Sequence, residues 1–378
     1  MVSVIKASKQ ASVEFLRELR ETSASLRLGS LPAHMRQSPM PRLGLLLTLY
    51  TTLAIAQTVT SLDSHTTENL RGVCSVSASV VWASGTQGTY LRTTDTGKTW
   101  IPAQVPGAEK LDFRDVESFS ADEAYLLAAG PGEQSCIYKT TDAGQHWLLQ
   151  FTNTDPQGFY DCFAFWDRNH GIAVGDPVDG RFELLTTDDG GAHWTALSAK
   201  QRPEALPHEG AFAASGTCIT VQGENNVWFA TGGPAARVFR STDRGRSWAV
   251  AETPLAHGND SSGIFSIAFR DGQHGLIAGG DYQHPDADGP NLATTNDGGA
   301  TWQLLPAHPQ FYFSAIGFTD PHSEDFLAVG ATHSIAGDVK GPSTGRSLST
   351  TLNALSPVGT REAIAVGPKG EIVRITLP

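Results

Sequence analysis

The chain has 378 residues and a formal net charge of −12, with 27 Lys and Arg residues against 39 Asp and Glu residues. Because nucleic-acid binding relies on cationic side chains that meet phosphates, this acidic balance argues against nucleic acid as a partner. The length also exceeds what one compact hydrophobic core normally holds. None of the four cysteines forms a C-x-x-C pair, so a zinc ribbon or a thioredoxin-like site has no support.

An export signal is predicted within the first 56 residues. Arg36 and Arg42 form a basic flank, Leu43–Ala56 is apolar, and the small residues before Gln57 fit a cleavage site. The apolar core is too short to cross a bilayer as a helix, and no cysteine follows it that could carry a lipid. We expect 1–39 to be a mis-annotated or disordered extension, with the true start at Met35 or Met40, and 40–56 to be a signal peptide. Residues 57–378 are then a single exported domain, periplasmic or extracellular, without a stable membrane anchor.

A Ser/Thr-x-Asp-x-Gly-x-x-Trp phrase recurs along the rest of the chain. Intact copies occupy 93–100, 140–147, 187–194, 241–248 and 295–302, and a degenerate sixth copy, GPSTGRSL, occupies 341–348. A period of about 46 to 54 residues is typical of a repeat architecture.

Each repeat contains the pattern of four short strands. An alternating run such as Phe159–Phe165 comes first, an apolar run ending in Gly such as GIAVG follows, and a third run ends in Thr-Thr or Ser-Thr. The segment after the Trp supplies a fourth strand. Four antiparallel strands per repeat of this length predict a blade of a β-propeller, and therefore an all-β fold that divides its interior into small cores between blades.

The number of blades follows from the register of the repeats. Six phrases mark six blades, and Thr351–Leu355, Ala363–Val366 and Glu371–Ile375 offer three further strands. We predict that Thr58–Asp63 supplies the fourth strand, so that the N-terminal segment closes a seventh blade and removes exposed sheet edges. Six blades with a loose tail is the alternative.

The repeated residues are interpreted as structural. The Asp can accept hydrogen bonds from backbone N–H groups of the turn, the Gly allows a left-handed backbone, and the Trp buries a large apolar surface. A catalytic or metal-binding group is normally needed once and not five times at equal spacing, so we assign no catalytic residue and no metal to these turns. The structural set is Asp95, Trp100, Asp142, Trp147, Asp189, Trp194, Asp243, Trp248, Asp297 and Trp302.

These phrases resemble the Asp-box, or BNR, repeat. The segments LRGVCSVSASVVWASGTQGTYLRTTDTGKTW, HGIAVGDPVDGRFELLTTDDGGAHW and VFRSTDRGRSW are similar to the photosystem II stability/assembly factor-like family of bacterial secreted proteins. The resemblance implies a propeller and, from the photosynthetic members, a non-enzymatic role in assembling a membrane complex. Asp-box propellers also include sialidases and other glycoside hydrolases.

The cysteines and histidines give no metal site. Cys162 and Cys218 fall at nearly the same place in consecutive blades, and an oxidising compartment would permit a disulfide between them. Bridged Cα atoms must lie within roughly 7 Å, and adjacent inner strands can exceed this, so buried free thiols are favoured for all four cysteines, Cys74 and Cys136 included. The histidines recur at equivalent turn positions, which favours turn chemistry: His146, His193, His170 and His274.

A ligand site is predicted on the loops opposite the repeated turns, because those loops differ most between repeats and loops usually carry function. The loops at Gly175–Arg181 and at 280–289, the crossing at Arg202–Phe212 and the starts of first strands supply candidate polar residues. The predicted binding face comprises Arg71, Arg114, Tyr160, Asp161, Asp176, Arg181, Glu209, Arg237, Asp281, Tyr282 and His284.

Two functions are compared on this basis. A non-catalytic monomer that binds an unknown protein or a glycan needs only this face, and it is favoured. The alternative is a glycoside hydrolase of the sialidase or BNR-repeat type that acts on an extracellular glycan, for which a carboxylate pair could supply acid/base groups. Arg71, Arg114 and Arg237 are the only plausible arginine trio, and their spacing does not match the sialidase layout. No dinucleotide fingerprint is present, so no cofactor is expected.

Overall fold

The computed structural model describes residues 58–305, 311–320, 322–340 and 351–377. The predicted N-terminal extension, the signal peptide and the sixth copy of the phrase lie outside these residues. Within the described ranges, no helix has the length and apolar character needed to cross a bilayer.

The described residues form seven antiparallel sheets, and the strands of each blade run from the innermost outward. Blade 1 contains β2 (Leu70–Ser75), β3 (Val81–Gly85), β4 (Thr89–Thr93) and β5 (Ile101–Gln104). Blade 2 contains β6 (Phe113–Ser118), β7 (Ala124–Ala128), β8 (Cys136–Thr140) and β9 (Leu148–Thr152). Blade 3 contains β10 (Tyr160–Phe165), β11 (Gly171–Val178), β12 (Arg181–Thr187) and β13 (Thr195–Ala196). Blade 4 contains β14 (Ile219–Gln222), β15 (Asn226–Ala230), β17 (Arg237–Ser241) and β18 (Ala249–Glu252).

The remaining blades complete the ring. Blade 5 contains β19 (Asn259–Phe269), β20 (Gly275–Asp281), β21 (Leu292–Thr295) and β22 (Gln303–Leu304), and the short β16 (Gly232–Gly233) pairs with β19 on its inner side. Blade 6 contains β23 (Ala315–Phe318), β24 (Asp325–Val329) and β25 (Ser334–Asp338) among the described residues. Blade 7 contains β26 (Ala354–Pro357), β27 (Glu362–Val366), β28 (Ile372–Thr376) and β1 (Thr58–Leu62). Two 3-10 turns, η1 (Gly132–Gln134) and η2 (Pro368–Gly370), lie between second and third strands.

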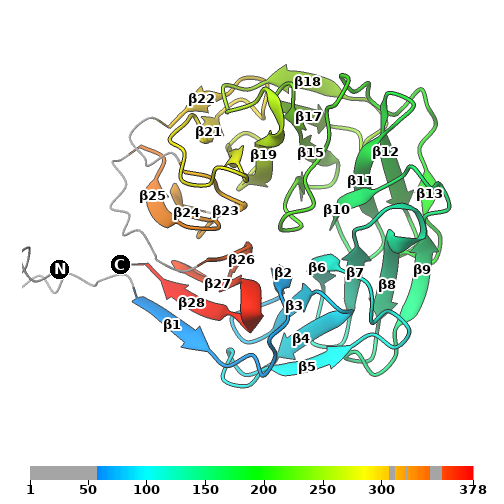
Figure 1. The fold of residues 1–378 in the computed structure, drawn as a ribbon, viewed down its shortest axis with the longest axis vertical. Coiled ribbons are helices and arrows are strands. Elements are labelled where there is room, and N and C mark those ends of the chain that lie inside the picture. The colour runs from blue at the N-terminus through cyan, green and yellow to red at the C-terminus, as the bar shows by residue number, and fades with distance from the viewer. Residues whose placement is uncertain (1–57, 306–310, 321, 341–350, 378) are drawn as a thin grey trace, which may run out of the picture. The chain divides into compact units, whose positions relative to one another are not determined.

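The blades form a closed ring (Figure 1). Inner strands of consecutive blades contact one another in chain order, from β2 and β6 round to β23 and β26, and β26 contacts β2. The N-terminal strand β1 pairs antiparallel with β28, from Thr58 opposite Thr376 to Leu62 opposite Ile372. The predicted all-β, seven-bladed propeller closed by the N-terminal strand is therefore confirmed, and the six-bladed alternative is wrong.

The hydrophobic interior lies between the blades. Each of seven buried clusters combines residues of two adjacent blades; the cluster between blades 3 and 4, for example, joins Phe182 to Phe229 and Phe239. Because each sheet is covered by its two neighbours, no blade can bury its faces alone, and closure of the ring is a condition of the fold.

The repeated turns connect third to fourth strands and are built alike. In the first copy, Asp95 Oδ1 accepts hydrogen bonds from Thr93 Oγ1 and from the Thr99 backbone N–H, both at 2.9 Å, while Thr93 Oγ1 accepts one from the Gly97 N–H. Gly97 has a φ of +77°, which an L side chain resists. The same three hydrogen bonds recur in the other four copies.

The turn histidines bind the carboxylate of their own turn. His146 and His193 place Nδ1 2.6 Å from Oδ2 of Asp142 and Asp189, and both rings are exposed. The backbone N–H of His193, followed by its ring, lowers the pKa of Asp189 to about 2. His170 and His274 pair in the same way with the Asp three residues before them. These contacts account for the recurring histidines as parts of the turns.

The turn tryptophans differ in burial, and this difference makes their contribution testable. Trp100 is 1% exposed in the cluster between blades 7 and 1, whereas Trp194 is only half-buried. Trp100→Ala is expected to lower the free energy of unfolding by about 3–5 kcal/mol because it leaves a large cavity, and Trp194→Ala is expected to lower it less. Denaturant unfolding of both variants measures this, and equal losses would contradict the assignment of burial as the cause.

Candidate functional site

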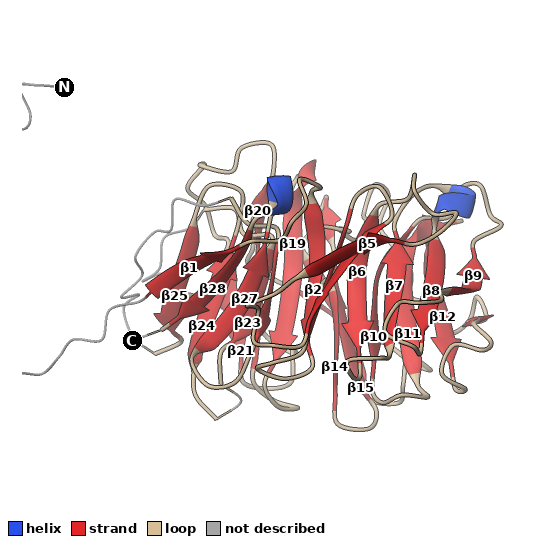
Figure 2. Ribbon diagram, turned by 90° about the horizontal axis from the view of Figure 1, so that it is seen from below, coloured by secondary structure: helices blue, strands red, loops and turns tan. Residues whose placement is uncertain are grey.

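The two ends of the ring differ. The turns between first and second strands and the repeated turns lie at one end, which we call the turn face. The connections between second and third strands, which include η1 and η2, lie at the other end, which we call the loop face (Figure 2).

Four inner strands carry a β-bulge at the same level near the loop face. The register shifts between Leu70 and Gly72 in β2, between Phe113 and Asp115 in β6, between Tyr160 and Cys162 in β10, and between Ile264 and Ser266 in β19. A bulge inserts an extra residue and re-aims its side chain. The extra residues all line one cavity: Arg71, Arg114, Asp161 and Phe265.

This cavity has a volume of about 950 Å³, which is within the range of ligand sites in proteins. Besides the bulge residues, its walls contain the aromatic side chains Phe212, Tyr282 and Tyr312. The Phe212 and Phe265 rings stack with centroids 3.9 Å apart, and the Tyr312 ring meets Phe265 edge-on. Six of the residues predicted for the binding face line the cavity: Arg71, Arg114, Asp161, Asp176, Glu209 and Tyr282.

Three other predicted residues have structural partners instead of a place in the cavity. Tyr160 is buried between blades 2 and 3, because the bulge turns Asp161 toward the channel and leaves Tyr160 facing the core. Arg181 pairs with Glu204 at 2.6 Å. Arg237 does not line the cavity. It pairs with Glu209, whose side chain is fully buried, and so holds this part of the cavity wall in place.

The last two predicted residues, Asp281 and His284, bind each other at the edge of the loop face. His284 Nδ1 lies 3.0 Å from Asp281 Oδ2, and neither residue lines the cavity. Burial opposes ionisation of Asp281, but hydrogen bonds led by that from Ser261 Oγ hold its pKa at about 2.

The predicted loop at Gly175–Arg181 is mostly strand. β11 continues to Val178 and β12 begins at Arg181, joined by Asp179 and Gly180 with φ values of 52° and 76°. Two successive left-handed residues suit a two-residue hairpin turn. The two strands therefore continue as a hairpin past the end of the neighbouring strand. Asp176 is therefore held on a strand and not on a loop.

The link between blades 3 and 4 crosses the central channel. Residues Gly210–Thr217, which we call the plug, contain a single backbone bridge, from Gly210 to Gly232. The Ala213 carbonyl accepts hydrogen bonds from Arg71 at 3.3 Å and Arg114 at 3.2 Å. The Ala213 backbone also lies beside the Asp161 carboxyl group.

The other end of the plug is bound by blade 5 and by the segment before blade 6. Thr217 Oγ1 lies 2.7 Å from Ser266 Oγ, and Ser215 Oγ donates to the Ser314 carbonyl at 2.8 Å. Gly216 has a φ of +75°, and a Cβ there would lie 2.2 Å from Asp115 Oδ1, so a side chain is excluded.

The plug separates two cavities. The loop-face cavity has residues up to Ala214 in its wall, whereas a second cavity of about 450 Å³ on the other side is lined by Ser215, Gly216 and Thr217. Residues from the inner strands of all seven blades surround the second cavity, which identifies it as the channel itself. The loop-face cavity therefore has a floor and does not open through the ring.

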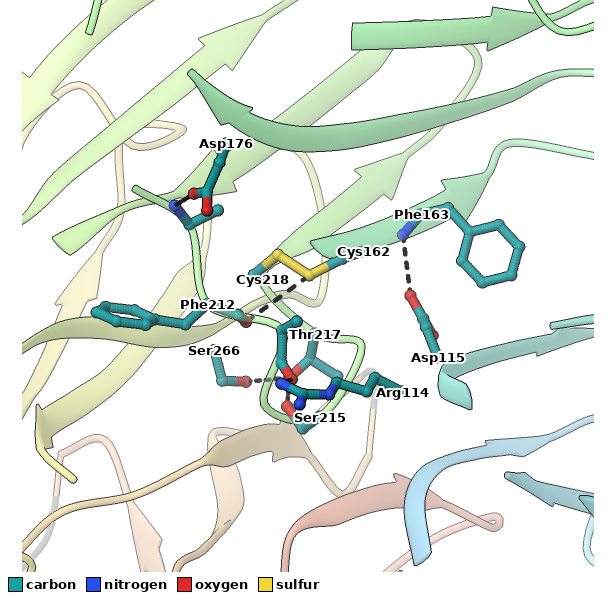
Figure 3. The surroundings of a disulfide bond; sticks show 12 residues. Arg114, Asp115, Cys162, Phe163, Asp176, Phe212, Ser215, Thr217, Cys218 and Ser266 are labelled. Atoms are coloured by element: carbon teal, nitrogen blue, oxygen red, sulfur yellow. Dashed lines mark hydrogen bonds between the residues drawn. A yellow bond between two sulfur atoms is a disulfide. The ribbon is translucent and has the colours of Figure 1, made fainter. Parts of the chain in front are cut away.

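The prediction of four free thiols is wrong for two cysteines. Cys162 and Cys218 form a disulfide, with Cα atoms 6.1 Å apart (Figure 3). Cys218 does not lie in the first strand of blade 4; it directly follows the plug and precedes β14, and this position brings it within reach of β10. Cys74 and Cys136 are free.

The cavity contains polar groups whose hydrogen-bonding capacity is unused. Burial, followed by the proximity of Asp176, raises the pKa of Asp161 well above its usual range, and burial raises the pKa of Asp176 to about 6. Burial and the neighbouring Arg114 lower the pKa of Arg71. Asp161 Oδ2 and Arg71 Nε are buried and have no hydrogen-bond partner in the protein. Arg114 is neutralised by Asp112 at 2.8 Å.

No metal centre is evident in the part of the chain that the structure describes. Among those residues, no group of three His, Cys, Asp or Glu side chains is placed to hold a metal ion. The chemistry available in the cavity is hydrogen bonding to Arg71 and to the two aspartates, together with contact to aromatic rings.

Comparison with known proteins supports the likeness to photosystem II stability/assembly factors and does not test the Asp-box resemblance. No family model matches the chain. The chain is similar to the chloroplastic photosystem II stability/assembly factor HCF136 of Arabidopsis thaliana, with 36% identity over 66 residues. This match covers 17% of the present chain and spans only 15% of the length of that relative.

Solved structures similar to this chain have low sequence identity to it, and those with a TM-score above 0.5 share its fold. Virginiamycin B lyase from Staphylococcus aureus is 12% identical, with a TM-score of 0.61 over 85% of this chain and 100% of the lyase chain. YCF48 bound to a D1 peptide is 16% identical, with a TM-score of 0.42 over 85% of this chain and 95% of the YCF48 chain. The likeness to the lyase shows that the fold alone does not decide between catalysis and binding.

The raised pKa of Asp176 predicts a dependence of stability on pH. The pKa of about 6 in the folded protein exceeds the usual value for Asp, about 3.9, so this group stabilises the fold below pH 4 and that contribution is lost as the pH rises through 6. In Asp176→Asn, the amide oxygen can still accept from Ala211 but does not titrate. Between pH 4 and 7, the free energy of unfolding of the variant is expected to fall by on the order of 2 kcal/mol less than that of the wild-type protein.

Unfolding free energies of both proteins across this range measure the effect. A pH profile of Asp176→Asn that parallels the wild-type profile would contradict the assignment. Asp189, with a pKa lowered to about 2, titrates below this window, so Asp189→Asn is the matched control.

Proposed function

We propose that this chain is an exported, non-catalytic β-propeller that serves as a binding or assembly platform, in a role similar to that of photosystem II stability/assembly factors. Its partner would present an extended segment to the loop-face cavity. The observation that carries this proposal is the convergence of bulge residues from four blades on one cavity. The similarity to HCF136 supports the assembly role.

The unused polar atoms favour a peptide as the bound group. Arg71 Nε requires a hydrogen-bond acceptor and Asp161 Oδ2 can accept a donor or, when protonated, donate. A peptide group brings one carbonyl and one N–H, which match the donor character of Arg71 and the acceptor character of Asp161, and buried polar groups strongly favour such pairing. The plug already places the Ala213 backbone against these side chains, and Arg71 donates to the Ala213 carbonyl, so the site can accommodate a peptide group.

The aromatic wall supplies the apolar part of the site. The Tyr282 side chain is 48% exposed, and its ring centroid lies 6.1 Å from that of Phe265. An exposed aromatic residue beside polar groups is typical of the positions that contribute most to protein interfaces. Tyr282 is therefore the side chain expected to contact an incoming segment first.

A second candidate function is glycoside hydrolysis. It is favoured by one observation: Asp161 and Asp176 both line the cavity and both have raised pKa values, as a general acid requires. Each of these carboxyl groups, however, lies against the backbone of the plug: Asp176 accepts the Ala211 N–H, and Asp161 lies beside Ala213. This structural use accounts for their placement, and the platform remains the preferred function.

Peptide binding can be tested with an array of extended peptides of about 15 residues and varied sequence. Wild-type protein is expected to retain a subset of peptides, and Tyr282→Ala and Arg71→Gln to weaken that binding at least about tenfold, equivalent to about 1.4 kcal/mol. Gln222→Ala, which changes the cavity on the turn-face side of the plug, is the control and should bind normally. Absence of any bound peptide, or equal loss in the control, would refute the site.

Catalysis is tested separately by incubating the protein with a panel of glycans and measuring released sugar. No turnover is expected from the wild-type protein. Turnover that disappears in Asp176→Asn, with the fold retained, would reject the non-catalytic proposal in favour of the hydrolase.

A further inference from the structure

We infer that the Cys162–Cys218 disulfide positions the plug, so that the loop-face cavity acquires its floor only after this disulfide has formed. The inference concerns the wall of the site proposed above, but it rests on contacts within the chain, and its test requires no ligand. The disulfide joins β10, the inner strand of blade 3, to the residue that directly follows the plug.

The plug has little regular structure of its own. Apart from the Gly210–Gly232 bridge, its backbone groups bond mainly to side chains and strands of the channel wall, such as Ala213 with Arg71 and Thr217 with Ile267. A segment without a ladder of internal hydrogen bonds opens more easily than a strand within a sheet. Its position therefore depends on how firmly the wall holds it.

The non-covalent contacts at the loop-face end are individually weak. The two arginine bonds to the Ala213 carbonyl are long, at 3.3 and 3.2 Å. The stacked ring of Phe212 adds an apolar contact to blade 5.

The disulfide supplies the covalent attachment that these contacts lack. It lies beside the bulge that carries Asp161, and Figure 3 shows it among the side chains that bind the plug or belong to it, including Arg114, Ser215 and Thr217. Both cysteines are fully buried in the folded protein, so an oxidant can reach them only while this part of the channel is open. Once formed, it ties the end of the plug to the same strand that presents Asp161 to the cavity.

Formation of this bond needs an oxidant, and a disulfide-bearing thiol oxidant such as oxidised glutathione suffices. The thiolate of one cysteine attacks a sulfur of the oxidant, forms a mixed disulfide and releases one thiol; the second cysteine then displaces the other thiol. Two protein thiols are oxidised, one disulfide of the oxidant is reduced to two thiols, and the two protons pass to the released thiols. An oxidising compartment, as the proposed export implies, would allow this step.

Hydrogen–deuterium exchange of the folded protein tests the inference. The oxidised wild-type chain is compared with Cys162→Ala/Cys218→Ala and with the control Cys74→Ala/Cys136→Ala, which keeps the bridge. Fragments that contain 210–217 are expected to exchange at least about tenfold faster in the first variant only, while β7, which is buried throughout, keeps its protection. Equal protection of the plug in all three proteins would overturn the inference.

A second measurement covers the case in which the double variant does not fold. Wild-type protein is prepared and kept in reductant, and alkylation verifies four free thiols instead of the two expected after oxidation. Faster exchange in the plug with β7 still protected supports the inference. Loss of protection in β7 as well would overturn it, because the disulfide would then stabilise the whole propeller and not the plug. None of these outcomes depends on whether peptides bind.

Discussion

The fold depends on shared cores, since each blade buries its faces only against its two neighbours. The seven clusters lie between blades, and the cluster between blades 7 and 1 joins Ile364 and Val366 to Leu70 and Trp100. A gap anywhere in the ring would expose two apolar sheet faces at once. The antiparallel pairing of β1 with β28 prevents this, because it adds the fourth strand to a blade in which β26, β27 and β28 supply only three. The regular turns follow from the same constraint: five copies of one hydrogen-bonded corner give the blades similar spacing.

A symmetric ring does not by itself make a site, and the irregularities of the inner strands introduce the asymmetry. The bulges occupy the same level in β2, β6, β10 and β19, yet they carry residues of different chemistry: two arginines, an aspartate and a phenylalanine. The same β-bulge, repeated in four inner strands, thus places side chains of different chemistry in one cavity. This arrangement reconciles strong repetition of the scaffold with a cavity that has a cationic wall at Arg71, an acidic wall at Asp161 and an aromatic wall at Phe265.

The sequence predicts the repeated part of this structure well, because each blade supplies an independent copy of the same evidence. The phrase ending in Trp100 or Trp194 locates third and fourth strands, and the register of the copies gives seven blades. Arg71, Arg114 and Asp161 are identifiable from their positions at the starts of first strands, and aligning IFSI with LRGV at that level would add Phe265. The plug is not predictable in this way, since its path depends on contacts with blades 1, 2 and 5 that have no local signal. The disulfide escapes prediction for the same reason: the spacing of the repeats places Cys218 in a first strand, whereas it directly follows the plug.

The plug also determines what kind of site the propeller has. Without a floor, an opening surrounded by seven inner strands would be a solvent-filled passage, and a ligand could make contact only at its rim. With Gly210–Thr217 across it, the same opening becomes a cavity with a floor, lined by Arg71, Asp161 and Phe265. A group bound there contacts polar and aromatic side chains at once, which the rim of an open passage would not offer. A segment that belongs to no blade therefore turns one open end of the ring into a cavity with a floor, which is why the proposed function is argued from the plug and not from the propeller alone.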